Sequence, residues 1–328
     1  MKAVYIREFG GPENLEIRDV PDPPKPTGTQ VLVRVRAAGL NRADLLQRKG
    51  LYPAPVDYST NIPGLEFAGE IAEIGEGASL FKIGDRVFGI TAGEAQAEYL
   101  LADESVLARV PANLSFAEAA AVPEAFITAH DAIFTQCGLQ AAELLLIHAV
   151  GSGVGLAALQ LAKANGVKVF GTSRTADKLE RCKEFGLDEA IVVVEDPGFS
   201  EIVKDKTDGK GVDVVLDLVG ASYFNENLAS LALKGRLILV GMTGGSSTEF
   251  NLGIALYKRL TIIGTVLRAR PIEEKAAATK AFADAVLPLF GNGAVKPNLD
   301  KVFNFADVSE AHEYLESNES FGKVVLEF

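Results

Sequence analysis

The chain has 328 residues, which is long for a single hydrophobic core, so we expect two domains. A formal net charge of −12 and a pI near 4.9 argue against nucleic acid or an anionic membrane as a principal partner. Its two cysteines, Cys137 and Cys182, are too few for a disulfide framework or a zinc cluster. The N-terminus lacks a signal-peptide core and no stretch has transmembrane length, so we expect a cytoplasmic protein that is not bound to a membrane.

The first 122 residues predict a β-rich region. Runs that alternate apolar and polar residues, as half-buried strands do, are separated by Gly-rich turns. The expected strands include residues 1–7, 31–37, 67–75, 85–89 and 97–101.

From residue 123 to residue 266 the pattern changes to alternating strands and helices. Six apolar β-runs at this spacing indicate a doubly wound parallel sheet of the Rossmann type. The runs are residues 144–147, 168–172, 190–194, 212–217, 236–241 and 260–266.

The remaining residues predict two helices and a strand. One helix is expected from Ile272 towards Leu287, and another around 309–316. The strand 322–326 has no obvious partner in the parallel sheet, so we expect it to return to the first domain. This gives an α/β protein with one domain of residues 1–122 plus 267–328 and a second domain of residues 123–266.

A glycine-rich turn, Gly-Ser-Gly-Val-Gly at 151–155, follows directly on the apolar run 144–147 and leads into a predicted helix. Backbone without Cβ atoms lets a pyrophosphate come close, and the helix N-terminus offers free N–H groups. The alternative is a tight strand–helix turn with no ligand.

The segment after the next strand indicates which dinucleotide binds. An NAD site places Asp or Glu there to hold the ribose 2′-hydroxyl, whereas this chain has Ser173, Arg174 and, one helical turn on, Lys178. A hydroxyl and two cations suit a 2′-phosphate, so we expect NADPH rather than NADH. The alternative is that both cations are ordinary solvated charges.

Five short segments spread over the whole chain occur together in one enzyme family. They are Ala37–Asp44, Pro63–Gly69, Val122–Ala129, His148–Gly155 and Gly322–Leu326. Through them the chain resembles the medium-chain dehydrogenase/reductase superfamily, and most closely its zinc-independent, zeta-crystallin-like NADPH:quinone oxidoreductases. The resemblance implies a GroES-like, β-rich catalytic domain together with a Rossmann domain.

The metal ligands of zinc-dependent relatives are replaced in this chain. Those relatives have a cysteine where Asn41 stands, and a Gly-His-Glu where this chain has Gly64, Leu65 and Glu66. Leucine cannot coordinate a metal, and an amide is a poor substitute for a thiolate. Residues 86–115 also lack the cysteines of a structural zinc lobe. We therefore expect chemistry without a metal.

The resemblance also implies a set of site residues. Tyr52 and Asn41 would donate hydrogen bonds to an oxygen that gains charge as hydride arrives, although Tyr52 is equally well interpreted as a loop aromatic. Ser152 replaces the middle glycine of the family's loop, and it would contact cofactor or substrate, cap the helix, or both. The expected cofactor-binding residues are Asn41, Thr128, Gly151, Ser152, Gly153, Val154, Gly171, Thr172, Ser173, Arg174, Lys178, Val240, Gly241, Met242, Val266, Leu267 and Arg268.

The expected reaction is hydride transfer from NADPH to a quinone-type acceptor. The first alternative is reduction of an activated double bond, as in alkenal or enoyl reductases of the same superfamily. Under these two interpretations the small-molecule substrate is a quinone or an enone. The second is an NADPH-binding protein with little turnover. The resemblance further implies a homodimer in which strand 260–266 of each subunit pairs edge to edge.

Overall fold

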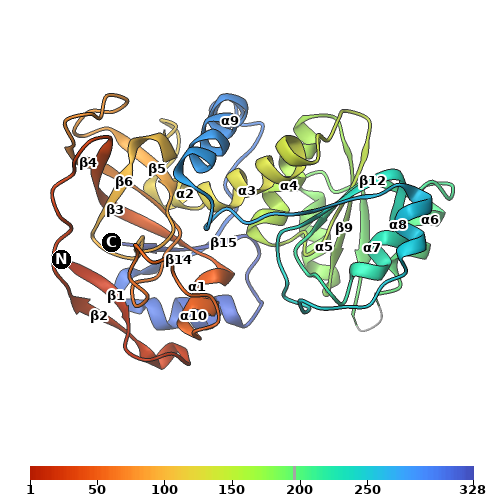
Figure 1. Ribbon diagram of the computed structural model, residues 1–328, viewed down its shortest axis with the longest axis horizontal. Helices are drawn as coiled ribbons and strands as arrows, with labels where there is room; N and C mark the ends of the chain where they lie inside the picture. The colour runs from red at the N-terminus through yellow and green to blue at the C-terminus, as the bar shows by residue number, and fades with distance from the viewer. Residues whose placement is uncertain (195–196) are drawn as a thin grey trace. The chain divides into compact units, whose positions relative to one another are not determined.

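The computed structural model describes residues 1–194 and 197–328, which form two units (Figure 1). Unit 1 contains Met1–Ile127 and Leu267–Phe328, and unit 2 contains Thr128–Val266. The π-helical segment η3 (Pro123–Ile127) therefore belongs to unit 1, and unit 2 begins after it. In the described part of the chain, every helix is too short or too polar to cross a lipid bilayer.

Unit 1 is built on a seven-stranded sheet and a separate two-stranded sheet. The larger sheet has the order β14-β15-β3-β4-β5-β7, with β6 paired to β3 as well, and the smaller one is β1-β2. The strands are β1 (Lys2–Ile6), β2 (Leu15–Asp19), β3 (Gln30–Leu40), β4 (Glu66–Ile74), β5 (Arg86–Ile90), β6 (Tyr99–Asp103), β7 (Leu107–Arg109), β14 (Leu299–Asn304) and β15 (Lys323–Glu327).

The helices of unit 1 begin where the sequence supplies capping residues. In α2, Ser115 accepts from the backbone N–H of Glu118, whose carboxylate bonds back to Ser115. The long helix α9 follows Pro271 and has acidic residues in its first turn, where the helix dipole favours them. The helices are α1 (Arg42–Arg48), α2 (Phe116–Ala120), α9 (Ile272–Gly291) and α10 (Val308–Glu316), with short 3-10 segments η1 (Pro12–Asn14), η2 (Glu104–Val106) and η5 (Phe305–Asp307).

The strand near residue 325 returns to unit 1, as expected. β15 pairs antiparallel with β3, from Val324 opposite Leu40 to Glu327 opposite Ala37, and parallel with β14. Its buried side chains join a core that α10 covers. Because β15 enters the sheet next to β3, residues of the C-terminal segment reach the start of α1.

Unit 2 contains the predicted doubly wound parallel sheet. Its strand order is β10-β9-β8-β11-β12-β13 and all its pairings are parallel, which confirms the prediction. β12 begins five residues before the expected start at Arg236. The elements are β8 (Leu144–Ile147), β9 (Lys168–Ser173), β10 (Glu189–Val192), β11 (Val212–Asp217), β12 (Leu231–Leu239), β13 (Thr261–Gly264), α3 (Thr128–His130), η4 (Asp131–Gln136), α4 (Gly153–Ala164), α5 (Ala176–Lys183), α6 (Phe199–Lys206), α7 (Phe224–Ser230) and α8 (Leu252–Lys258).

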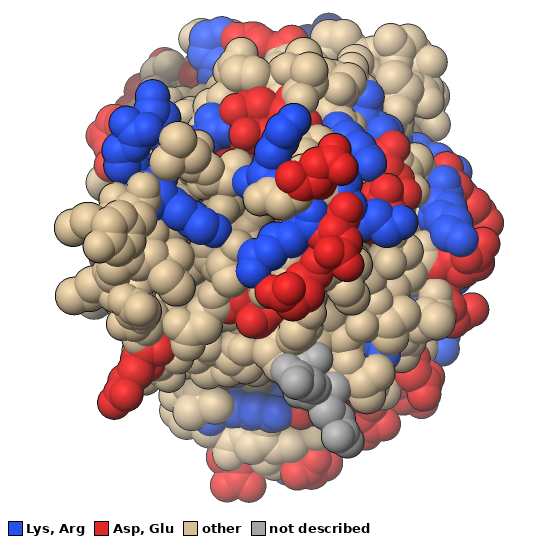
Figure 2. Space-filling model, turned by 90° about the vertical axis from the view of Figure 1, so that its right-hand side faces the viewer, with Lys and Arg blue, Asp and Glu red and all other residues tan. Residues whose placement is uncertain are grey.

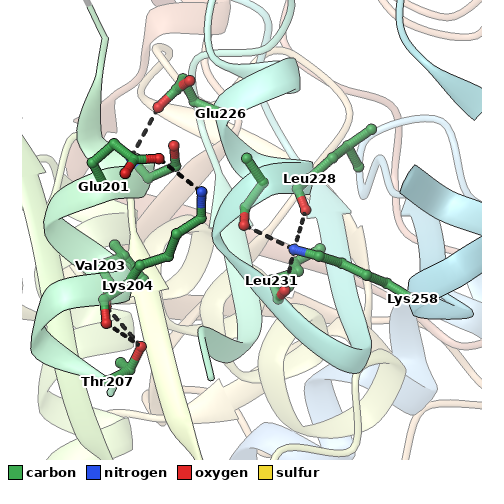
Figure 3. Close-up of polar contacts among 10 residues, drawn as sticks. Glu201, Val203, Lys204, Thr207, Glu226, Leu228, Leu231 and Lys258 are labelled. Carbon is green, nitrogen blue, oxygen red and sulfur yellow. Dashed lines mark hydrogen bonds and ion pairs between the residues drawn. The ribbon is translucent and has the colours of Figure 1, made fainter. Parts of the chain in front are cut away.

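A lysine anchors α8 to the rest of unit 2 (Figure 3). The ammonium of Lys258 donates to three carbonyl oxygens around the C-terminus of α7, those of Leu228, Ala229 and Leu231, at 3.0, 2.8 and 2.6 Å. A cation at this position satisfies carbonyls that the helix leaves unpaired and interacts favourably with its dipole. The segment between β12 and β13 is thereby fixed to the sheet.

Charges of both signs are interleaved on the face of the molecule that Figure 2 shows. Lysine and arginine side chains lie beside aspartate and glutamate side chains there, with uncharged areas between them. The net charge of −12 disfavours binding to a polyanion.

Candidate active site

The glycine-rich turn of unit 2 has the strand–turn–helix geometry that the sequence predicts. It connects β8 to α4, and Ser152 is the helix N-cap, its hydroxyl accepting from the backbone N–H of Gly155 at 3.1 Å. A Cβ atom at Gly155 would lie 2.6 Å from the carbonyl oxygen of Ala149, and Ala149 itself has a φ of +48°. The turn therefore requires glycine at 155, and its hydroxyl-capped helix N-terminus presents Gly151, Gly153 and Val154.

A buried chain of polar side chains ties together three strands of the sheet at their carboxyl ends. His148, just after β8, bonds through Nδ1 to the Thr172 hydroxyl of β9 at 2.9 Å and through Nε2 to Asn227 Oδ1 at 2.5 Å. The amide of Asn227 donates at 2.9 Å to the Asp217 carboxylate of β11. Since Asn227 donates to that carboxylate, its oxygen must accept from His148, which places the imidazole proton on Nε2. Burial lowers the pKa of His148 to about 4, so the ring is neutral.

Asp217 also fixes the end of β12. Its carboxylate accepts from the backbone N–H groups of Val219 and Gly220, and its carbonyl oxygen accepts from Val240 and Gly241. Burial raises the pKa of Asp217 to about 6 despite these donors. Val240 and Gly241 are thus held at the sheet edge, whereas Met242, the next residue, is exposed.

The residues expected to bind the ribose phosphate begin at Ser173, the last residue of β9, which pairs with β8. Gly171 packs so closely that an added Cβ atom would be 2.8 Å from atoms of Leu187 and Val150. The hydroxyl of Ser173 accepts from the N–H of Thr175, and the side chain of Arg174 is exposed. Lys178 lies in the first half of α5. The structure therefore brings these residues to the same sheet edge as the glycine-rich turn.

A buried ion pair in unit 1 holds the side chain of Asn41. The ammonium of Lys323 lies 2.5 Å from Glu66 Oε1, and it also donates at 2.7 Å to Asn41 Oδ1 and to the carbonyl oxygen of Leu40. The amide nitrogen of Asn41 donates at 2.8 Å to the same Glu66 oxygen. One amide N–H of Asn41 remains for an acceptor. Glu66 thus orients the Asn41 amide by hydrogen bonding.

The start of α1 is fixed by Asp44. Its fully buried carboxylate accepts from the backbone N–H groups of Asn41 at 2.8 Å and Gly64 at 3.0 Å. Gly64 has a φ of +111°, and an added Cβ atom would be 2.5 Å from the backbone nitrogen of Gln96, so this position requires glycine. Burial raises the pKa of Asp44 to about 6. Asp44 therefore links the helix that carries Asn41 to the turn that precedes Glu66.

A second glutamate, Glu124, is partly buried and lies beside the fully buried Glu66. Its backbone N–H donates to Glu66 Oε2 at 2.8 Å, so both oxygens of Glu66 are occupied by donors. Burial and, next, the charge of Glu66 raise the pKa of Glu124 to about 8, against the opposing influence of Lys323 and Arg268. At neutral pH the Glu124 side chain is consequently a carboxylic acid.

The loop that carries Tyr52 is fixed by Arg268. The buried guanidinium donates to the carbonyl oxygens of Ala92 and Tyr52 at 2.7 and 3.2 Å and to Gln47 Oε1 at 2.6 Å. Its carbon lies 4.8 Å from the centre of the Tyr52 ring, a cation–π contact. Burial raises the pKa of Tyr52, so the phenol keeps its proton at neutral pH. Arg268 therefore orients Tyr52 within unit 1.

The other predicted residues occupy separate places in the two units. The buried hydroxyl of Thr128, in α3, has no hydrogen-bond partner among the described residues. Val266 is about half exposed at the end of unit 2, and Leu267 is buried at the start of the returning segment of unit 1. Asn41 and Tyr52 belong to unit 1, whereas Ser152 belongs to unit 2.

The roles of Lys323, Asp44 and Glu124 are not evident from the sequence motifs. Lys323 is the second residue of the segment Gly322–Leu326 and looks like any strand lysine, and its partner Glu66 is distant in sequence. Asp44 stands three residues after Asn41, a spacing typical of a capping box that would have indicated its bond to the Asn41 backbone. Glu124 lies in the segment Val122–Ala129, but nothing in that segment indicates its role, because its environment comes from other elements.

Comparison with known proteins identifies the family. Residues 27–131 match the alcohol dehydrogenase GroES-like domain, and residues 153–284 match the zinc-binding dehydrogenase family. A human protein named quinone oxidoreductase is 32% identical over 330 residues, which cover 99% of this chain and 97% of the relative. This chain belongs to the medium-chain dehydrogenase/reductase family. Within it, the chain is a member of the zeta-crystallin-like group.

Solved structures of this family confirm the GroES-like and Rossmann-type folds of the two units. Escherichia coli quinone oxidoreductase in complex with NADPH is 29% identical, with a TM-score of 0.89 and full coverage of both chains. The CurK enoyl reductase is 27% identical, with a TM-score of 0.88 and coverage of 99% and 98%. In the described residues, no three His, Cys, Asp or Glu side chains are grouped so as to hold a metal ion.

Proposed function

We propose that this medium-chain dehydrogenase/reductase is an NADPH:quinone oxidoreductase that acts without a metal. The observation that carries the proposal is the Asn41–Glu66–Lys323 cluster, in which an amide and an ammonium are bonded to the glutamate beside Leu65. These side chains supply hydrogen-bond donors and positive charge, whereas a zinc site needs thiolate or imidazole ligands. The full-length similarity to quinone oxidoreductases supports the same conclusion.

Unit 2 has the features that a nicotinamide dinucleotide requires. The helix N-terminus at Ser152 offers backbone N–H groups, and Gly155 leaves room for the turn. The unpartnered hydroxyl of Thr128 supplies a further donor. Ser173, Arg174 and Lys178 replace the carboxylate of NAD sites, so we infer a preference for NADPH.

The residues of unit 1 bind and polarise the acceptor in this proposal. NADPH, when bound, supplies the hydride. The Tyr52 phenol and the free N–H of Asn41 donate to the acceptor oxygen, which becomes more negative as the acceptor is reduced. Lys323 supports that charge through Asn41. A quinone is electron-poor enough that positioning and hydrogen bonds suffice.

NADPH oxidation with a panel of quinones and enones tests the proposal directly. Turnover is expected with quinones, and faster turnover with NADPH than with NADH. The likeness to the CurK enoyl reductase makes reduction of an activated double bond the second candidate, which turnover with enones alone would establish. NADPH binding without turnover on either class would identify a binding protein. We also infer that the protein works in the cytoplasm, since its two cysteines are unpaired.

Replacing Tyr52 by phenylalanine separates chemistry from binding. Tyr52→Phe is expected to lower kcat with a quinone about tenfold, because one neutral hydrogen bond contributes about 1–1.5 kcal/mol. NADPH affinity, measured by fluorescence titration, should stay nearly unchanged. Tyr99→Phe, at a partly exposed tyrosine of β6 in unit 1, is the matched control. Unchanged turnover in Tyr52→Phe would make Tyr52 a loop residue with no part in the reaction.

The open edge of the unit 2 sheet is the proposed dimer interface. β13 is the edge strand, its residues are largely exposed, and Leu252, Leu256 and Tyr257 of the neighbouring α8 are exposed as well. An apolar edge of this kind is an aggregation hazard unless another strand covers it.

Light scattering at micromolar concentration is expected to give the mass of a dimer. Ile262→Lys, which places a charge on the edge, should give a monomer. Val192→Lys, on the opposite edge strand β10, should leave the dimer intact. A stable monomer of the unaltered protein would rule out the dimer.

A further inference from the structure

The acceptor-binding region of unit 1 contains two adjacent glutamates with very different surroundings. Glu66 is fully buried, and its two oxygens accept from Lys323, from Asn41 and from the backbone of Glu124. By contrast, no donor in residues 1–194 and 197–328 bonds to the Glu124 carboxyl. When two carboxyl groups lie together, the one with donors keeps the charge and the other keeps a proton.

The ionisable groups that face Glu124 come from every element around it. The negative groups are Glu66 of β4 and Asp44 of α1. The positive groups are Lys323 of β15, Lys275 of α9, and Arg268, which precedes α9. The phenol of Tyr52 also interacts with the Glu124 charge. Glu124 is therefore joined to Asn41 through Glu66, whose two oxygens accept from the Asn41 amide and from the Glu124 backbone, and its charge influences Tyr52.

We propose that Glu124 is the general acid that protonates the reduced acceptor. The inference rests on the proposed function. Hydride transfer adds two electrons and a hydrogen nucleus to the acceptor and leaves a negative charge on its oxygen. The O–H bond of Glu124 then breaks, its proton forms a new O–H bond on that oxygen, and Glu124 becomes a carboxylate. Water in the solvent reprotonates Glu124, so each turnover consumes one proton from solution.

The raised pKa of Glu124, about 8, fits this role. A general acid works best when its pKa is close to the working pH, because it is then both protonated and able to release its proton. The neutral acid also leaves Lys323, Arg268 and Lys275 in excess over Glu66 and Asp44, and that excess favours a negative acceptor oxygen.

Glu124→Gln tests the role because glutamine imitates the neutral acid but has no proton to transfer. With a quinone, kcat at pH 6.5 is expected to fall about tenfold. This loss is smaller than the usual effect of removing a general acid, because water also protonates a hydroquinone oxygen. The unaltered enzyme should lose activity as pH rises through about 8, whereas the variant should be insensitive to pH in this range. Glu274→Gln, at an exposed glutamate of α9, should behave like the unaltered enzyme.

An infrared titration provides a readout that needs no acceptor. A carbonyl stretch of a protonated carboxyl group that disappears as pH rises through about 8 should be present in the unaltered protein and missing in Glu124→Gln. The bands of Asp44 and Asp217, whose pKa is about 6, disappear at lower pH and should remain in the variant. Full turnover in Glu124→Gln, or no band that disappears as pH rises through about 8, would overturn the assignment. If no acceptor supports turnover by the unaltered protein, the proposed function fails, and the catalytic role of Glu124 fails with it. The infrared band would still show whether the Glu124 side chain is protonated.

Discussion

Lys323→Met is expected to lower the free energy of unfolding by about 3–5 kcal/mol, the usual cost of removing one partner from a buried ion pair. Glu66 is fully buried, and Lys323 is its only cationic partner within 4 Å among the described residues. Without the ammonium, the Glu66 charge is left uncompensated, and the carbonyl oxygen of Leu40 loses a donor. Urea denaturation followed by circular dichroism measures the change.

Two further variants make the Lys323 result specific. Lys280→Met removes an exposed lysine of α9 whose pair with Asp284 spans one helical turn, and it should cost less than about 1 kcal/mol. The double variant Glu66→Gln/Lys323→Met removes both charges and should recover a large part of the loss. A Lys323→Met protein as stable as Lys280→Met would show that the buried pair contributes little.

Arg174→Ala is expected to weaken NADPH binding by about 1.5–3 kcal/mol, a roughly tenfold to hundredfold increase in Kd. The guanidinium is exposed beyond β9, and in our proposal it meets the 2′-phosphate. NADH lacks that phosphate, so its affinity should hardly change. Fluorescence titration with each nucleotide gives both constants.

The control for Arg174 is another exposed arginine of the same region. Arg181→Ala, in the last turn of α5, should leave both affinities close to those of the unaltered protein. Higher salt should weaken NADPH binding more than NADH binding in the unaltered protein, and this difference should shrink in Arg174→Ala. Equal losses for the two nucleotides would show that Arg174 does not read the phosphate.

The strands and helices could be predicted because their signals are local. Apolar alternation placed β3 and β4, and the glycine-rich turn after an apolar run placed β8 and α4. The predicted start of β12 was wrong because the pair Lys234-Gly235 resembles a turn in sequence. In the structure Lys234 does adopt a φ of +64°, but the strand continues through it. The sheet tolerates this irregularity since the parallel pairing with β11 shifts register there.

The site could be predicted only as far as the family motifs reach. Asn41 and Ser152 stand in such motifs, and the resemblance to the family supplies Tyr52. Glu124 stands in the motif Val122–Ala129 as well, but its proton depends on burial and on Glu66, which lies on another element. The surroundings of Arg268 show the same limit. Sequence placed it among the cofactor contacts, and the structure shows its guanidinium bonded to Gln47 and to two carbonyl oxygens of unit 1.

The distance along the chain between Lys323 and Asn41 has a consequence for biosynthesis. Their hydrogen bond joins residues 282 positions apart, while unit 2 is a continuous segment that ends at Val266. A ribosome adds about 5–20 residues per second, so the interval between Val266 and Lys323 lasts about 3–11 s. During this time a nascent chain can already fold its nucleotide-binding unit, yet the ammonium that neutralises Glu66 does not exist. We therefore expect nascent chains to acquire NADPH affinity several seconds before they acquire the ability to reduce anything with it.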